Sequence, residues 1–174
     1  MSIKHSWIYA LQVDVKDLNG NNIIKNILVP YDGSKFAKKA LVYAKDIAQK
    51  GNTIIFLLRI VDEHEYLHGV LLAELEADYT VRDTIHKFIK SEIINEKKKL
   101  EKITHVNENE KIKIHHHVIK GDPIVAILDY AQAKKIDLIC IGSQGLKGIE
   151  KLKAIGSTSR KISELAKCPV MIVH

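Results

Sequence analysis

Short apolar runs alternate with segments of helical periodicity along most of this chain, and this alternation constrains its fold more than any other feature. The runs that we interpret as strands cover residues 26–30, 53–61, 111–119, 137–142 and 169–173. The segments with helical periodicity cover residues 36–48, 80–104, 123–135 and 157–167. Strands and helices in this order build a parallel sheet with helices on both faces. Because crossover connections are right-handed, we expect a doubly wound α/β sheet of five strands.

Two segments lie outside this repeating pattern. Alternating apolar residues between Trp7 and Val15 suggest a strand, and a turn-rich break follows at residues 17–22. We therefore interpret residues 1–24 as an N-terminal extension and residues 25–174 as the α/β domain. Residues 62–78 mix leucines with glutamates after the second strand. They are interpreted as either a plain surface helix or a lid at the ligand edge of the sheet.

Composition narrows the class of protein. The chain has 174 residues, of which 46% are hydrophobic, so one folded domain is expected rather than a disordered chain. No apolar run reaches the roughly 18 residues of a membrane-spanning helix, and the N-terminus lacks the apolar block of a secretory signal. Cys140 and Cys168 lie in apolar runs, which indicates buried, reduced thiols. These observations predict a cytoplasmic protein.

The charge balance is mildly basic. Lys plus Arg is 27 and Asp plus Glu is 21, which gives 27 − 21 = +6. Part of this excess comes from the segment NEKKKLEK at residues 95–102. A solvated helix face explains such a segment better than a polyanion site does. We therefore do not expect nucleic acid as a partner.

Ligands of doubly wound sheets bind beyond the carboxyl ends of the strands, where the strand order reverses. This rule points to the loops after Val29, after residues 58–61 and after Ile141. The last of these loops reads GSQGLKGIEKLKAIGSTS, residues 142–159. Its glycines, and the hydroxyl residues at the start of the last helix, are typical of a phosphate cradle. The alternative is that Ser157 simply caps that helix.

Asp32 follows the first strand in the sequence VPYDGSK. A carboxylate at this position could accept hydrogen bonds from ribose hydroxyls. An aspartate that stabilises the turn or caps the helix is the alternative.

Three consecutive histidines, His115 to His117, raise the question of a metal site. On a strand, His115 and His117 share one face and His116 points to the other. Zinc needs about four ligands, and no cysteine partner is near. We therefore predict no metal site, and no catalytic thiol either.

Taken together, NILVPYDGS, the later GDP before a helix, and the ending IGSQG…GSTSRKISELAKCPVMIV make the chain resemble the universal stress protein family. The resemblance runs from about residue 25 to residue 174. It implies a Rossmann-like fold with strand order 3-2-1-4-5. It also implies a homodimer through the last strand, which runs from Pro169 to Val173. One branch of the family binds ATP through a G-x2-G-x9-G-[ST] signature.

Carried onto this sequence, the ATP-binding branch implies a nucleotide site. Asp32 with Pro30 and Tyr31 would hold the ribose and line the adenine pocket, and the backbone of Ile60 would hydrogen-bond adenine. Gly121 would lie near the nucleotide. The ribose and phosphate site would comprise Ile141, Gly142, Gly145, Gly156, Ser157 and Thr158. Mg²⁺ commonly bridges such phosphates. One departure is that ten residues, not nine, separate Gly145 from Gly156. The extra residue could bulge out at Gly148 or misplace Gly156.

The first hypothesis is thus a dimeric, ATP-binding regulatory module of the stress response, with an unidentified protein partner. No general base is placed beside a phosphate, so we predict no catalytic residues and at most slow ATP hydrolysis. The second hypothesis is a dimeric stress or adaptor protein that binds no nucleotide. An enzyme of adenylyl or phosphoryl transfer is a third.

Overall fold

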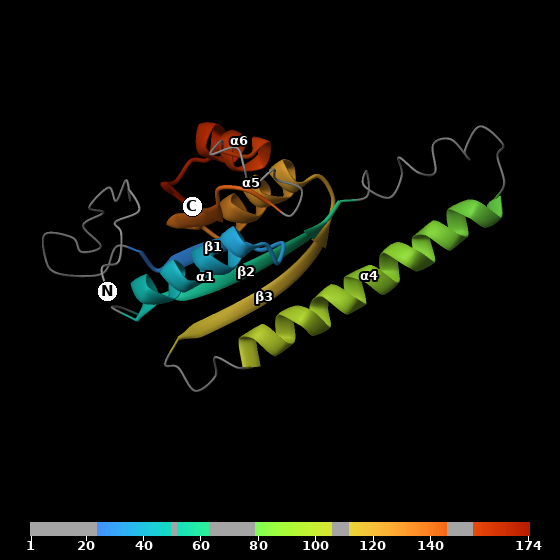
Figure 1. Ribbon diagram of the computed structural model, residues 1–174, viewed down its shortest axis with the longest axis horizontal. Coiled ribbons are helices and arrows are strands. Elements are labelled where there is room, and N and C mark those ends of the chain that lie inside the picture. Colours follow the sequence, from blue (N-terminus) through green and yellow to red (C-terminus); the bar gives the residue numbers. More distant parts are fainter. Residues whose placement is uncertain (1–23, 50–51, 63–78, 106–111, 146–154) are drawn as a thin grey trace, which may run out of the picture.

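A computed structural model describes residues 24–49, 52–62, 79–105, 112–145 and 155–174. It contains a five-stranded parallel sheet with the strand order β3-β2-β1-β4-β5, which confirms the expected doubly wound fold (Figure 1). The strands are β1 (Asn26–Pro30), β2 (Ile54–Val61), β3 (Lys113–Lys120), β4 (Leu138–Gly142) and β5 (Val170–Val173). The helices are α1 (Lys35–Ala48), α4 (Tyr79–His105), α5 (Pro123–Ala133) and α6 (Ser157–Leu165).

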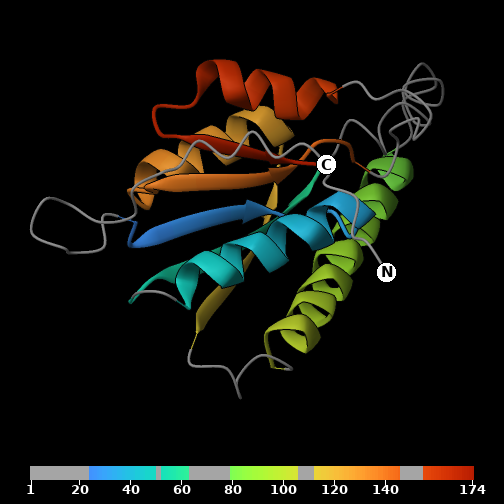
Figure 2. The same ribbon diagram turned by 60° about the vertical axis from the view of Figure 1, so that its left-hand side comes forward.

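The sheet lies between two layers of helices, with α1 and α4 on one face and α5 and α6 on the other (Figure 2). Because successive side chains of a strand point to opposite faces, one strand can contribute side chains to both hydrophobic cores. Ile27 and Val29 pack in the core under α1 and α4, whereas Leu28 packs in the core under α5 and α6. All three side chains are fully buried.

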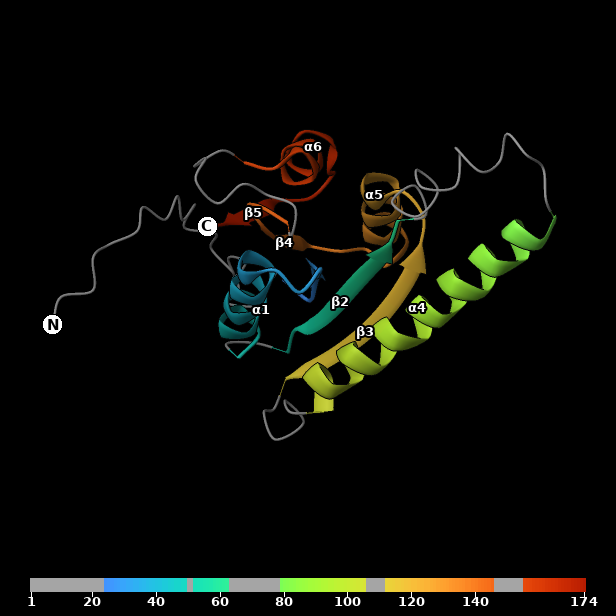
Figure 3. The same ribbon diagram turned by 45° about the vertical axis from the view of Figure 1, so that its right-hand side comes forward.

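Helix α4 rests on the sheet through a stripe of residues spaced three and four apart. The stripe contains Ile89, Ile93, Glu96, Leu100 and Ile103, all of them buried or partly buried. The amino-terminal part of the helix runs on beyond the ends of the strands (Figures 1 and 3). The helical periodicity of residues 80–104 predicts that Phe88 lies on this apolar side beside Ile89, but its side chain is 49% exposed. That expectation is wrong because adjacent residues of a helix are rotated by about 100°.

The helices begin with different caps. The side chain of Ser34 accepts a hydrogen bond from the N–H of Ala37 at the start of α1. Asp122 accepts the N–H groups of Ile124 and Val125 at the start of α5. Helix α6 has Gly156 at its N-cap position, and glycine has no side chain that could accept a hydrogen bond there. The alternative that Ser157 merely caps α6 is therefore wrong, because the capping position belongs to the glycine.

Strands β1 and β4 separate toward their carboxyl ends. β1 pairs with β2 from Asn26 to Pro30, but its register with β4 covers Ile27 and Leu28 alone. Pro30 ends β1 and has no N–H to donate to a neighbouring strand. This is also where the chain order of the sheet reverses, so the fold opens a crevice at this edge.

Several sequence predictions lie outside the described residues. They are the strand and turn of the N-terminal extension, the lid or helix between residues 63 and 78, and a bulge at Gly148. None of the helices in the described ranges is both long and apolar enough to cross a membrane.

Candidate functional site

A cavity of about 430 Å³ lies at the carboxyl edge of the sheet. The three loops that the sequence pointed to all contribute to its wall. The described residues that line it are Pro30, Tyr31, Asp32, Ser34, Ala37, Arg59, Ile60, Val61, Asp62, Pro123, Ile127, Ile141, Gly142, Gln144, Gly145, Gly156, Ser157, Thr158 and Ser159. The structure thus brings every predicted site residue except Gly121 into one cavity.

Gly121 lies just past the end of β3 and is not part of the cavity wall. Its N–H donates a 3.1 Å hydrogen bond to the carbonyl of Val61, which does line the cavity. Its φ angle is +144°, a conformation that glycine adopts readily. The glycine therefore forms a turn beside the cavity, and any contact with a ligand stays a prediction.

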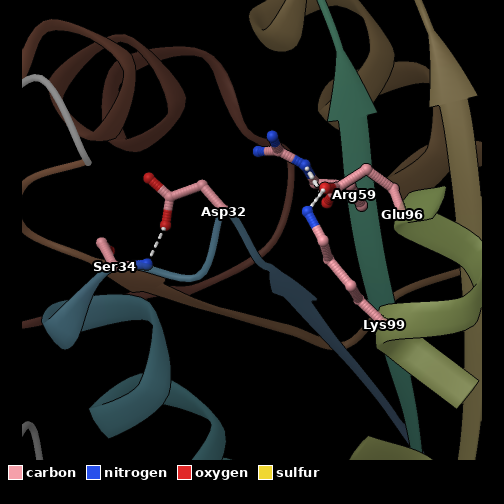
Figure 4. A network of polar contacts seen from close by, with 5 residues as sticks. All are labelled: Asp32, Ser34, Arg59, Glu96 and Lys99. Carbon is pink, nitrogen blue, oxygen red and sulfur yellow. Dashed lines mark hydrogen bonds and ion pairs between the residues drawn. The ribbon is translucent and has the colours of Figure 1, made fainter. Parts of the chain in front are cut away.

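The turn role of Asp32 is confirmed, and its contact with a ribose stays a prediction. Its Oδ1 accepts the N–H of Ser34 at 2.9 Å, which makes it a turn aspartate (Figure 4). The same carboxylate lines the cavity, and a Cβ on Gly145 would lie only 2.9 Å from its Oδ2. The neighbouring Tyr31 is half-buried, and burial together with the charge of Asp32 raises its pKa. Asp32 thus presents a carboxylate acceptor to the cavity.

The backbone of Ile60 also faces the cavity. The N–H of Tyr31 donates to the carbonyl of Leu58 at 2.7 Å, so the Leu58 carbonyl points toward β1. Carbonyls alternate in direction along a strand, so the carbonyl and N–H of Ile60 point to the same side. Because the register of β1 stops at Pro30, opposite Leu58, Ile60 has no β1 residue across from it. Its backbone groups are therefore directed at the space beyond β1.

The glycine loop is closed by hydrogen bonds between its two ends. The N–H of Gly156 donates to the carbonyl of Ser143 at 2.7 Å, and the buried Oγ of Ser159 donates to the carbonyl of Gly142 at 2.7 Å. Ser34 Oγ donates to the Gln144 carbonyl at 3.3 Å. Gly156 therefore lies next to Ser143 even though ten residues follow Gly145 before it.

A side chain at Gly142 or Gly156 would meet different parts of the protein. A Cβ on Gly142 would lie 2.7 Å from the carbonyl carbon of Phe36 and 2.8 Å from the nitrogen of Ala37. A Cβ on Gly156 would lie 3.2 Å from the carbonyl oxygen of Ser143. The sequence argument attributed these glycines to close approach of a ligand. For Gly142 the structure gives another reason, because the first turn of α1 occupies the space beside it.

The start of α6 supplies polar donors to the cavity. Ser157, Thr158 and Ser159 form its first turn and line the wall. The first N–H groups of a helix have no partner within the helix, and the helix dipole favours negative charge near them. With Gly156 at the capping position, these donors suit an anion such as a phosphate.

Sequence reasoning missed Arg59, Asp62 and Gln144 in the cavity wall. Arg59 had a recognisable signal, because it is the one charged residue in the strand IIFLLRIV. Its Nε lies 2.8 Å from Glu96 Oε2 on α4 (Figure 4). Glu96 is likewise the polar member of the apolar stripe of α4.

The histidines and thiols lie away from this cavity. His117 packs beside Tyr130 with ring centroids 5.5 Å apart, and His116 contacts Thr104 on the opposite face. No group of three or more metal-ligating side chains occurs among the described residues. Burial raises the pKa of Cys140 to about 12 and also raises that of Cys168, so neither thiol is activated. Cys168 is only partly buried, contrary to the sequence prediction.

Comparison with known proteins identifies the family. A model of the universal stress protein family matches residues 24–174. The chain belongs to the universal stress protein family. This finding confirms the resemblance carried by the NILVPYDGS and GSTS segments.

Individual relatives agree with the assignment to universal stress proteins. A universal stress protein of Methanocaldococcus jannaschii is 30% identical over 155 residues, which cover 89% of this chain and 85% of that protein. Universal stress protein YxiE of Bacillus subtilis is 28% identical and is covered over 100% of its length. The structure of UspA from Lactobacillus plantarum superposes with a TM-score of 0.74 at 26% identity, over 88% of this chain and 100% of that one.

Proposed function

We propose that this universal stress protein binds ATP in the cavity at the carboxyl edge of its sheet and acts as a dimeric regulatory module rather than as an enzyme. One observation supports the proposal above all. Residues from three distant segments, among them Asp32, Ile60 and Gly156, line a single cavity of about 430 Å³. This volume falls in the range of about 300 to 1,000 Å³ that is common for small-molecule sites.

The chemistry of the wall suits the parts of a nucleotide. Pro30, Ile127 and Ile141 provide apolar surface for a base, and the backbone of Ile60 provides a donor and an acceptor for its edge. The carboxylate of Asp32 would accept hydrogen bonds from ribose hydroxyls. The first turn of α6 would hold phosphates, with Mg²⁺ as the ion that commonly bridges them.

Two solved structures of the same fold were obtained with nucleotides. One is a universal stress protein in complex with cAMP, at 20% identity, and the other is an Arabidopsis thaliana protein with AMP bound, at 16% identity. At these identities the likeness concerns the fold. The nucleotide is therefore proposed here from the cavity itself.

Strand β5 supports the homodimer that forms part of the proposal. β5 is at the edge of the sheet, opposite β3. Pro169 and Val173 direct their carbonyls to β4, because they accept the N–H groups of Ile139 and Ser143. Val170 and Ile172 consequently direct their backbone groups outward. An apolar edge with such groups favours pairing with a second copy of the same strand.

The adaptor hypothesis remains the alternative, and the ten-residue spacing in the glycine loop is the observation that favours it. Under this alternative the protein dimerises and contacts a partner without a nucleotide. A cytoplasmic location is part of both hypotheses.

Isothermal titration calorimetry with ATP tests the proposal. We expect Asp32→Asn to weaken ATP binding by about ten- to a hundredfold, the usual loss for a hydrogen bond to a charged group. Asp122→Asn is the matched control. It removes the same charge from a residue outside the cavity wall, where asparagine caps α5 equally well.

The outcomes separate the two hypotheses. Binding that is weakened by Asp32→Asn and unchanged by Asp122→Asn supports the ATP site. Wild-type protein that binds no ATP at high micromolar concentration, and releases no nucleotide on denaturation, supports the adaptor instead.

A further inference from the structure

Two charged residues face each other where the surrounding pattern is apolar. Arg59 interrupts the apolar strand IIFLLRIV, and Glu96 takes the place between Ile93 and Leu100 in the stripe of α4 that faces the sheet. A charge in such a position loses hydration and needs a partner. The packing of α4 on the sheet does not require a charged residue at either position, because an apolar pair of similar size is often as stable.

The Arg59 guanidinium lies against the Glu96 carboxylate. Nε of Arg59 lies 2.8 Å from Glu96 Oε2, and the two side chains are 23% and 12% exposed. Glu96 Oε1 is held in turn by Lys99 Nζ at 2.6 Å. The two terminal nitrogens of Arg59 are turned away from Glu96, toward the side on which Asp32 lies (Figure 4). Glu96 thus pairs with one edge of the guanidinium and leaves the other edge on the side of Asp32 (Figure 4).

The cavity wall combines this cation with carboxylates. Among its described residues, the charged side chains are Arg59, Asp32 and Asp62. A carboxylate accepts hydrogen bonds from hydroxyl groups but repels anions. A guanidinium donates two parallel hydrogen bonds to a phosphate or carboxylate. A ligand that satisfies both Asp32 and Arg59 therefore carries both hydroxyl groups and an anionic group, as a nucleotide does.

We propose that Arg59 is an anion-binding, specificity-determining residue of this cavity, positioned by Glu96, and that it selects phosphorylated ligands over neutral nucleosides. The proposal deepens the proposed function and rests on it for the identity of the ligand. The anion site itself rests on the Arg59–Glu96 pair and the cavity wall. Glu96 is a positioning residue, because it acts through Arg59.

Calorimetry with ATP, adenosine and inorganic tripolyphosphate tests this proposal. Arg59→Gln is expected to weaken ATP and tripolyphosphate binding by about ten- to a hundredfold and adenosine binding by less than about threefold. Arg59→Lys retains the charge without the fork of donors, so it should recover part of the loss. Glu96→Gln should reduce the preference for ATP over adenosine by a smaller factor than Arg59→Gln.

Lys99→Gln is the matched control. It removes one positive charge from the same Glu96 carboxylate, but its side chain is 67% exposed and lies outside the cavity wall. We expect it to leave all three affinities within about threefold. If Arg59→Gln fails to fold because Glu96 loses a partner, the double variant Arg59→Gln with Glu96→Gln removes both charges of the pair and serves in its place.

The changes in ATP, adenosine and tripolyphosphate affinity either support the proposal or overturn it. A fall in ATP affinity without a fall in adenosine affinity supports it. Equal falls for ATP and adenosine, or no fall for either, overturn it. If wild-type protein binds no nucleotide, the proposed function fails. The anion-binding role of Arg59 is then tested by tripolyphosphate binding alone. Tripolyphosphate binding that Arg59→Gln abolishes then supports the anion site, and absence of binding overturns it.

Discussion

The N–H of Gly156 donates a 2.7 Å hydrogen bond to the carbonyl of Ser143, which joins the start of α6 to the end of β4. The bond forms although the loop between Gly145 and Gly156 has ten residues instead of the nine of the family signature. Hydrogen bonds at the two ends, and not the residue count between them, thus place α6 beside the cavity. A longer loop costs little by itself, because loop-closure entropy grows slowly with length.

Ser159 is expected to contribute to this closure. Ser159→Ala removes a buried hydroxyl that donates to the Gly142 carbonyl at 2.7 Å, so the free energy of unfolding should fall by about 1 to 3 kcal/mol. Ser163→Ala in the same helix is the control, because the Ser163 hydroxyl is exposed and bonds within α6. Urea unfolding measures both. Equal effects of the two variants would contradict the role of Ser159.

Gly145 is expected to control the position of the Asp32 carboxylate. In Gly145→Ala, the new Cβ would lie 2.9 Å from Asp32 Oδ2 and push the carboxylate aside. A carboxylate moves easily, so the free energy of unfolding should change by less than about 0.5 kcal/mol, the usual range for a surface change. ATP affinity should fall several-fold in calorimetry. Unchanged ATP affinity would show that Gly145 does not influence ligand binding.

The hydroxyl group of Tyr130 is expected to lower the free energy of unfolding. Tyr130 is 8% exposed, its hydroxyl has no hydrogen-bond partner among the described residues, and burial raises its pKa to about 12. Tyr130→Phe removes an unsatisfied buried group and should raise the free energy of unfolding by about 1 kcal/mol. Tyr43→Phe, at an exposed position of α1, should have no effect. Destabilisation by Tyr130→Phe would indicate a partner for the hydroxyl.

His117 is expected to make stability depend on pH. Burial lowers its pKa, and the charges of Lys134, His115 and His116 lower it further. An unfolded histidine takes up a proton near pH 6.5, whereas folded His117 takes one up only at lower pH. Its contribution to stability is therefore present above about pH 6.5 and is lost as the pH falls toward the folded pKa.

The variant His117→Gln tests this dependence. Urea midpoints at pH 7.5 and pH 5.5 should differ less in the variant than in the wild type. The prediction fails if the two proteins lose stability equally on acidification.

The proposed dimer is expected to depend on the outward N–H of Ile172. Ile172→Pro removes that donor without touching the ladder to β4, and proline is tolerated at such edge positions. Light scattering during gel filtration should show a dimer for the wild type and a shift toward monomer for the variant. Ile172→Val keeps the N–H and should remain dimeric. A monomeric wild type at micromolar concentration would refute the dimer.

Most element boundaries followed from local sequence, and the deviations have local causes. The helix expected to reach residue 135 ends at Ala133, because Lys135 adopts a left-handed φ of +49°. The strand expected at residues 111–119 is Lys113–Lys120. Its alternating exposure reflects its place at the sheet edge.

The candidate site could be predicted in part. Asp32 follows β1, and Ile141 and Gly142 end β4. The carboxyl ends of these strands meet at one edge of any doubly wound sheet, so the proximity of the three residues was foreseeable. Gly156 belonged to the glycine-rich loop that the sequence pattern pointed to, whereas the role of Ile60 came from the family resemblance. Arg59 was missed, because whether a charged residue in a strand enters a cavity depends on the helix that covers it.

The sequence by itself determined the succession of strands and helices, because periodicity and turn residues act between near neighbours in the chain. The tertiary structure alone decided which residues fill the space around each position. It set the first turn of α1 against Gly142 and left Phe88 exposed at the side of α4. It also brought Glu96 to Arg59. Such contacts depend on how helices cross the sheet, which is decided by the packing of both cores at once and not by any one segment.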